Sequence, residues 1–201
     1  MSPRPAGIAW WILAVLATAV GSYGLLMIDA REHTDAVPGM PWLDELHFVT
    51  GGLALIVGIW GFRRDVLVRR RGLHRALGKV YVGSVLLGGL SGAAMACFAM
   101  GGAVPRVGFG LLALGWLGTT AAGWRAIHGS RNQGGRDVAA HRRWMVRSYA
   151  LTCAAITLRI QLGPLAMLLQ GFEPAYRIVA WSAWVPNALF AEWWLRRHPQ
   201  P

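Results

Sequence analysis

The stretch Leu73–Met100, LHRALGKVYVGSVLLGGLSGAAMACFAM, decides the fold that the sequence predicts. A histidine in a basic cluster opens it, and about 25 mostly apolar residues follow, a length that matches the hydrocarbon core of a bilayer. Its glycines and alanines suit close contact between helices. A second segment repeats this arrangement, because His141 and two arginines open an apolar run that ends at Met167. We therefore expect two membrane-spanning helices, each headed by a histidine.

The composition agrees with a membrane protein. Of the 201 residues, 55% are hydrophobic and only 14% are charged, whereas soluble domains carry about 25% charged residues. The mean hydropathy is +0.40. The net charge is +11, but the basic residues lie between apolar runs and form no contiguous surface, so we do not expect nucleic-acid binding.

Six apolar segments predict an all-α fold, a six-helix transmembrane bundle that forms one integral-membrane domain over residues 1–201. The predicted spans cover residues 8–28, 46–62, 76–100, 107–127, 144–169 and 176–195. Residues 17–19 resemble a signal-peptide cleavage site, but the apolar run continues to Ile28, and we favour an uncleaved helix. Pro164 should kink or shorten the fifth span near its end.

The charges between the spans predict the orientation. Most basic residues lie at the N-terminus, in residues 63–79, in residues 125–147 and in the C-terminal tail, whereas the opposite loops hold six of the nine acidic residues. Both termini should therefore be cytoplasmic. Only Lys79 among the basic residues is a lysine, a bias typical of GC-rich bacterial genomes, so we expect the bacterial inner membrane. Cys97 and Cys153 fall near opposite faces, and no disulfide is expected.

Small residues recur on the third and fourth spans. Gly88 and Gly92 form a GxxxG motif, and Gly115, Thr119 and Gly123 repeat small residues every four positions. Such faces let helix backbones approach closely, so we expect these two spans to be in contact. General helix packing explains the motifs without a partner protein.

The two histidine-headed helices suggest a haem site. His74 and His141 should lie at the same depth on the cytoplasmic side and could ligate one b-type haem through both axial positions. The basic residues that could pair with the haem propionates are Arg75, Lys79, Arg142 and Arg143. Against this hypothesis, bis-histidine sites usually lie deeper than the rim of a span, and such histidines can instead bind lipid headgroups or a loop carbonyl.

A second group of polar residues lies toward the outer face. His47 heads the second span beside Asp44 and Glu45. Arg159 stands about 22 Å along the fifth helix, in the outer part of the membrane. A charge at that depth should face the bundle interior and find a partner, and the polar residues at the start of the second span are the available candidates. A structural ion pair is the alternative to a functional site.

Glu192 poses the same question near the inner face. It stands about 24 Å along the sixth helix, and Arg147, one turn inside the fifth helix, is its best partner by depth. His141 and Lys79 are substitutes. Neither member of the pair should face lipid.

Several separated segments resemble, in order, a bacterial family of predicted membrane proteins, domain of unknown function 2306. The matching segments are HFVTGG (47–52), LHRALGKVY (73–81), GFG (108–110), WLGTT (116–120), HRRWMVRSY (141–149), AAITLR (154–159) and AE (191–192). The resemblance covers nearly the whole chain from the second span onward. It implies a multi-span bacterial membrane protein and supplies no activity.

HRALG, residues 74–78, is also similar to the His-Arg-x-x-Gly that heads a haem-binding helix in ascorbate-dependent transmembrane b-type cytochromes. Those proteins use four histidines in two pairs at opposite faces. Because this chain lacks a clear outer pair, the resemblance implies at most one haem.

Three functions remain open. The first is a redox protein that holds one b-type haem and exchanges electrons with a quinone or another membrane redox partner. The second is a cofactor-free transporter or small-ligand-binding protein, with Arg159 and His47 lining an outer cavity. The third is a structural subunit of a membrane assembly. The sequence contains no phosphate-binding loop, dinucleotide fingerprint, nucleophile elbow or metalloprotease helix.

Overall fold

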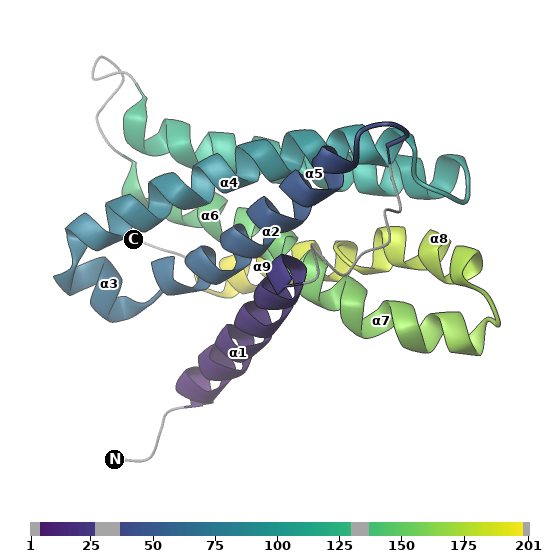
Figure 1. The fold of residues 1–201 in the computed structure, drawn as a ribbon. Helices are drawn as coiled ribbons and strands as arrows, with labels where there is room; N and C mark the ends of the chain where they lie inside the picture. The colour runs from purple at the N-terminus through teal and green to yellow at the C-terminus, as the bar shows by residue number, and fades with distance from the viewer. Residues whose placement is uncertain (1–4, 27–36, 130–136, 199–201) are drawn as a thin grey trace.

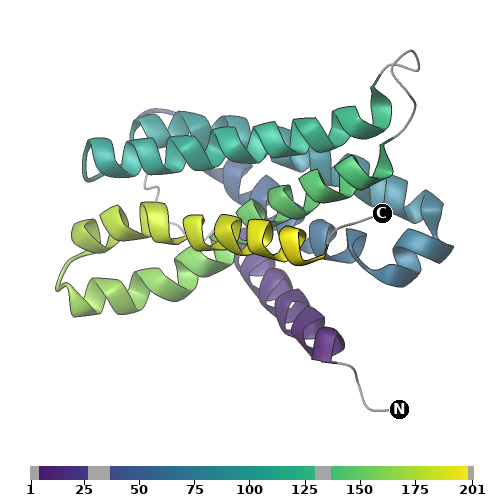
Figure 2. The same ribbon diagram turned by 180° about the vertical axis from the view of Figure 1, so that it is seen from behind.

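The computed structural model describes residues 5–26, 37–129 and 137–198, and this part of the chain is all helix, without a strand. The all-α fold and the bundle of membrane helices that the sequence predicts are confirmed. The helices, drawn in Figures 1 and 2, are α1 Pro5–Leu26, α2 Pro41–Gly61, α3 Arg64–Arg69, α4 Arg71–Cys97, α5 Ala103–His128, α6 Val138–Thr152, α7 Ala154–Leu168, α8 Phe172–Ser182 and α9 Val185–Arg197.

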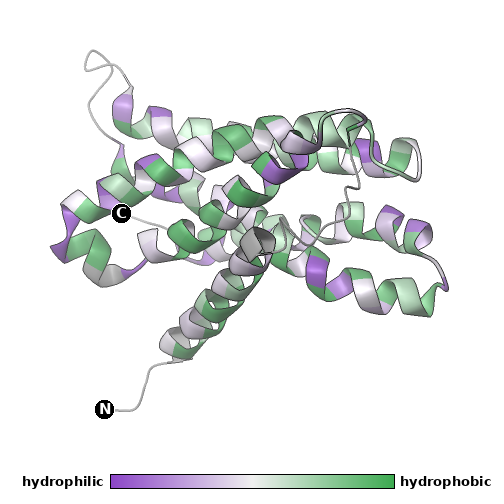
Figure 3. Ribbon diagram, viewed as in Figure 1, coloured by the Kyte–Doolittle hydropathy of each residue, from purple (hydrophilic) through white to green (hydrophobic). Residues whose placement is uncertain are grey.

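Four helical segments of the described chain are long and apolar enough to cross a bilayer. They are α2, α4, α5 and the continuous stretch Val138–Leu168, which comprises α6 and α7. The first helix adds a shorter apolar stretch, Gly7–Tyr23. Hydrophilic residues gather at α3 and at the starts of α4 and α6 (Figure 3). The predicted basic loop at residues 63–75 is in part helical, since it contains α3 and the first turn of α4.

The fifth span is interrupted at a residue that the sequence did not indicate. Helix α7 continues through Pro164 to Leu168, and the break lies instead at Cys153, between α6 and α7. The two halves have different neighbours, because α6 packs on α5 and α9 whereas α7 packs on α8. The break lets each half follow its own partner.

The sixth span is also divided, although the sequence predicted one helix over residues 176–195. Helix α8 ends at Ser182 and α9 begins at Val185, with Pro186 in its first turn. Proline has no N–H to continue the ladder of the preceding helix, so it favours a new start here. The Asn187 side-chain amide donates to the carbonyl of Ala183 at 3.1 Å and so satisfies a group near the break.

The long helices α4 and α5 lie side by side, with α2 packed on α4 and α6 packed on α5 (Figures 1 and 2). Helix α1 crosses α2 obliquely (Figure 1). The crossing is close, because a Cβ atom built on Gly52 would lie 2.8 Å from the carbonyl oxygen of Gly21.

The small residues of the third and fourth spans lie for the most part against α2 and α6. A Cβ on Gly88 would lie 2.8 Å from Thr50 Oγ1, and one on Gly92 would lie 2.9 Å from His47 Cε1, so the GxxxG face of α4 receives α2. Gly123 of α5 instead faces Met145 of α6. Helices α4 and α5 are in contact as expected, and Gly88 takes part in that contact, because a Cβ on it would also lie 3.4 Å from the Trp116 ring of α5.

Candidate functional site

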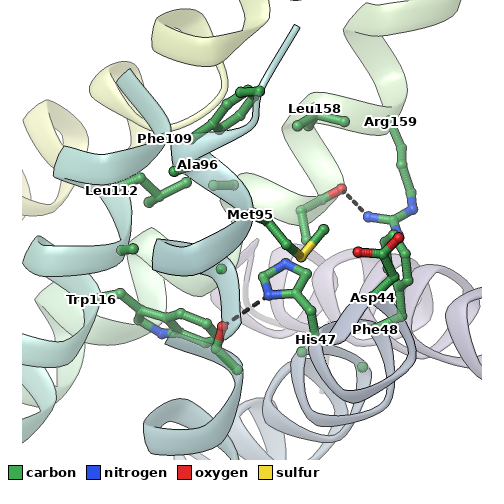
Figure 4. Close-up of a pocket in the computed structure, with 18 of the residues that line it drawn as sticks. Asp44, His47, Phe48, Met95, Ala96, Phe109, Leu112, Trp116, Leu158 and Arg159 are labelled. Atoms are coloured by element: carbon green, nitrogen blue, oxygen red, sulfur yellow. Dashed lines mark hydrogen bonds between the residues drawn. The ribbon is translucent and has the colours of Figure 1, made fainter. Parts of the chain in front are cut away.

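A cavity of about 740 Å³ lies inside the bundle, between α7 on one side and α2, α4 and α5 on the other. We call it the α2–α7 cavity. Figure 4 shows its polar residues and several of the apolar ones. Its lining includes Asp44, His47, Phe48, Met95, Phe109 and Arg159. A volume in this range suits an organic molecule of drug-like size.

His47 is held in place by the GxxxG face of α4. Its Nδ1 lies 2.8 Å from the carbonyl oxygen of Gly88, and its ring packs where a side chain on Gly92 would have to lie. A carbonyl can only accept a hydrogen bond, so Nδ1 carries the proton. In the neutral imidazole the other nitrogen, Nε2, is then an acceptor.

Arg159 and Asp44 approach the cavity from opposite sides. Arg159 stands on α7, where its Nη1 donates to the carbonyl of Ala155 at 3.0 Å. Asp44 belongs to the first turn of α2 and lines the same cavity (Figure 4). The charges of both residues act on His47. The structure thus brings three of the polar residues singled out in the sequence to one cavity, and exposed Glu45 also lines it.

A buried network of hydrogen bonds adjoins the cavity. Trp116 and Thr152 line it, and Trp116 Nε1 donates to Thr152 Oγ1 at 2.9 Å. The hydroxyl of Tyr81 lies 2.8 Å from Thr152 Oγ1 and 2.7 Å from Ser148 Oγ, and Thr120 Oγ1 lies 2.6 Å from Ser148 Oγ. The network ties α4, α5 and α6 together in the core.

The sequence analysis did not single out these network residues. One signal was present: Ser148 and Thr152 are one helical turn apart, as are Trp116 and Thr120, so each pair shares a helix face. Polar side chains repeated at that spacing inside an apolar run should face other helices.

The two predicted haem ligands lie near the N-terminal ends of α4 and α6. His74 precedes Tyr81 by seven residues and His141 precedes Ser148 by seven, so each histidine shares a helix face with a member of the hydrogen-bonded pair, two turns away. The two imidazoles are near enough for their charges to interact. His141 Nδ1 lies 2.8 Å from the carbonyl oxygen of Gly123, which leaves Nε2 as the acceptor nitrogen.

The basic residues proposed for the haem propionates follow one of the two histidines by one to five residues in the sequence. Arg75, Lys79 and Arg142 are exposed, and Arg143 is half-buried. Nδ1 of His74 is buried and makes no hydrogen bond of normal geometry within the described part of the chain. The described residues contain no group of three or more His, Cys, Asp or Glu side chains that could hold a metal ion.

Arg147 and Glu192 form an ion pair between α6 and α9. The guanidinium donates to both carboxylate oxygens, through Nε to Oε1 and through Nη2 to Oε2 at 3.0 Å. The Arg147 guanidinium also lies 4.7 Å from the centre of the Trp144 ring. The pair lies outside the α2–α7 cavity, and its geometry is that of a bidentate link between helices.

The model of one protein family, described as "Predicted membrane protein (DUF2306)", matches residues 45–195. The matched range begins two residues before His47 and ends three residues after Glu192, so it includes His47, Arg159, His74 and His141, whereas Asp44 lies just outside it. No curated protein and no solved structure matches the chain.

Proposed function

The chain belongs to this DUF2306 family of predicted membrane proteins, and we propose that it binds a small molecule in the α2–α7 cavity. The observation that carries the proposal is the gathering of Asp44, His47 and Arg159 at a cavity with mostly apolar walls. Mostly apolar pockets that hold a few converging polar groups are the usual form of small-molecule sites.

The free-energy cost of keeping the charged groups of this cluster inside a membrane protein supports a binding role. Charged side chains inside a membrane protein are expensive to keep there, and they commonly mark substrate or ion routes. Arg159 and Asp44 come from helices that are far apart in the sequence, and both face a cavity large enough for a ligand.

A cavity-filling variant tests the proposal. Leu158 lines the cavity, so Leu158→Trp should reduce its volume. Ile160, on the same helix, is 57% exposed and does not line it, so Ile160→Trp is the matched control. Both variants would be purified in nanodiscs formed directly from the membrane, and small molecules extracted from them would be identified by mass spectrometry.

We expect a molecule present at about one per chain in the wild type and in Ile160→Trp, and lost from Leu158→Trp. A co-purified molecule retained equally by both variants would place binding elsewhere. If the wild type retains no such molecule and binds none on addition, the proposal fails.

The location follows from the charge pattern. We place the protein in the bacterial inner membrane with both termini in the cytoplasm, because basic residues concentrate in the segments that the positive-inside rule assigns to that side. In this orientation the polar end of the cavity lies toward the outer face.

A second candidate function is redox, supported by the matching positions of His74 and His141, each seven residues before a member of the Tyr81–Ser148 hydrogen bond that joins α4 to α6. A b-type haem bound there would supply one-electron chemistry, with a quinone or another membrane redox protein as electron partner. In such a site His74 and His141 would hold the haem iron, with His141 presenting Nε2 because its Nδ1 is bonded to Gly123. The basic residues close to them in the sequence, Arg75, Lys79, Arg142 and Arg143, would pair with the propionates.

The visible absorption spectrum of protein expressed with added haem precursor, oxidised and then reduced with dithionite, tests this second function. A reversible b-type spectrum at about one haem per chain is expected for the wild type and for the control His128→Ala. His74→Ala and His141→Ala should each abolish it in monodisperse protein. A colourless wild type rules the haem out.

A further inference from the structure

The hydrogen-bond polarity of the α2–α7 cavity restricts the ligand. The bond between His47 Nδ1 and the Gly88 carbonyl fixes Nε2 of the neutral ring as an acceptor. Figure 4 shows this second nitrogen turned away from Gly88, toward the side of the ring where Met95 lies. A head group that bonds to it must offer a donor, such as a hydroxyl.

Arg159 imposes the opposite requirement. A guanidinium donates hydrogen bonds and accepts none. The head group that lies between α2 and α7 must therefore also present an oxygen that can accept. A hydroxyl on a polar ring meets both conditions, because its hydrogen donates to His47 Nε2 and ring oxygens accept from Arg159.

The walls favour a flat ring over a bare chain. Aromatic side chains reach the cavity from α2, α5 and α8 and from the end of α4, and those that line it are Phe48, Phe98, Phe109, Trp116, Phe172 and Tyr176. Aromatic side chains pack favourably on flat rings, in offset-stacked or edge-to-face arrangements. A saturated chain gains only the general apolar contact from such walls.

The rim of the cavity is apolar and open. Three of its lining residues are strongly exposed: Phe98 at 52%, Met100 at 54% and Phe172 at 49%. The fourth exposed residue of the lining is Glu45. In a protein that spans the membrane, an opening at the three apolar residues allows a hydrocarbon tail to leave the cavity beside apolar side chains. The ligand therefore need not fit wholly inside about 740 Å³.

We propose that the α2–α7 cavity binds a lipid-soluble hydroquinone, an aromatic ring with hydroxyl groups and an apolar chain, in preference to the corresponding quinone. The ring hydroxyl donates to His47 Nε2, ring oxygens accept from Arg159, and the chain leaves over the apolar rim. The quinone carries only acceptors and loses the bond to His47. This inference names the ligand class of the proposed function and rests on it.

Direct binding measurements on the full chain in nanodiscs test the proposal. The probes are decylubiquinol, kept reduced under argon, decylubiquinone, and dodecanoic acid as a chain without a ring. We expect saturable binding of both ring compounds, with the reduced form about tenfold tighter, as one additional hydrogen bond allows. Dodecanoic acid should bind more weakly than either.

His47→Phe keeps a ring but removes the acceptor, so it should bring the two affinities to within about twofold of each other. His128 stacks on Trp124 outside the cavity, and His128→Phe is the control that should keep the preference. Should His47→Phe fail to fold, the comparison of reduced and oxidised probe on the wild type still decides the question.

Equal affinity for the two oxidation states, or tighter binding of dodecanoic acid, overturns the hydroquinone assignment. If neither ring compound binds but Leu158→Trp still loses a co-purified molecule, the cavity is a binding site for another class of ligand. If no probe binds and no molecule co-purifies, both the assignment and the proposed function fail.

Discussion

Tyr81 and Ser148 join α4 to α6 through a 2.7 Å hydrogen bond between their hydroxyls, in the buried core of the bundle. The same tyrosine hydroxyl lies 2.8 Å from Thr152, and Thr152 lines the α2–α7 cavity. His74 and His141 lie on the same two helices, two turns nearer their N-terminal ends. This polar contact therefore helps to fix how α4 and α6 align along their length, and with them the positions of His74 and His141.

The first prediction concerns this contact. Tyr81→Phe removes the shared hydroxyl and should lower the free energy of unfolding by about 1 kcal/mol, the scale of interhelical hydrogen bonds in membrane proteins. Ser148→Ala should cost a similar amount, and the double variant should cost less than the sum, because both changes remove one interaction. Reversible unfolding in mixed micelles measures all three.

Thr119→Ala is the control for that cycle. The Thr119 hydroxyl bonds to carbonyls of its own helix, those of Gly115 at 2.7 Å and Trp116 at 3.2 Å, and its loss should change stability by only a few tenths of a kcal/mol. Strict additivity of Tyr81→Phe and Ser148→Ala would contradict the coupling.

The second prediction concerns the packing of the His47 ring against Gly92. A Cβ on Gly92 would lie 2.9 Å from His47 Cε1 and 3.1 Å from Nδ1, so Gly92→Ala should displace the ring and cost about 1 to 3 kcal/mol. Gly83, on the same helix, has nothing within 4 Å of its Cβ position, so Gly83→Ala should be neutral or slightly stabilising. Thermal unfolding in detergent compares the stability of the two variants. Equal effects would show that Gly92 does not provide the space that the His47 ring occupies.

The third prediction concerns the Arg147–Glu192 ion pair. Either Arg147→Gln or Glu192→Gln should destabilise the protein by about 1 kcal/mol, since the pair is bidentate but only partly buried. Exchanging the two residues, Arg147→Glu with Glu192→Arg, should recover part of that loss. The matched comparison is Arg177–Glu173, which is more exposed and should contribute only a few tenths of a kcal/mol.

The fourth prediction concerns orientation. Cys97 is an exposed free thiol at the end of α4, and the predicted topology places it near the outer face. A membrane-impermeant maleimide applied to intact cells should label the wild type and not Cys97→Ser. Cys153 lies in the break between α6 and α7 and should stay unlabelled. Labelling of Cys97 only after the membrane is opened would invert the topology.

The sequence predicted the helical segments well because the signal is local. A long apolar run flanked by arginines identifies a membrane helix without reference to the rest of the chain, and α2, α4 and α5 appear close to their predicted ranges. Depth along a helix is equally local, which is why the sequence alone sufficed to pair Arg147 with Glu192.

The interruptions depend on packing and could not be predicted in the same way. The run from Trp144 to Leu169 has continuous hydropathy, and nothing in it indicates that the helix breaks at Cys153. Pro164 was the natural candidate, yet the helix passes through it. For the sixth span Pro186 was a usable signal, since proline favours the first turn of a new helix.

The residues of the site divide in the same way, into those that the sequence alone indicates and those that only helix packing brings together. His47 and Arg159 attract notice in the sequence because charged or ionisable groups inside apolar runs are costly. Trp116 and Thr152 look like ordinary helix residues, and only the meeting of α5 with α6 makes them neighbours. Gly88 and Gly92 were identifiable as a contact face, but their spacing does not specify the partner, which is α2.

The fifth and sixth predicted spans are each divided into two helices, so each would cross the membrane only as two helices together. The helices α6, α7, α8 and α9 contain 15, 15, 11 and 13 residues, so each is roughly 16 to 23 Å long at 1.5 Å per residue. The hydrocarbon core is about 30 Å thick. No single piece reaches across, so Val138–Leu168, which is long enough to cross, does so only with α6 and α7 stacked end to end. Side chains at the joints therefore help to hold the pieces in line, as Asn187 does by donating to the carbonyl of Ala183 between α8 and α9.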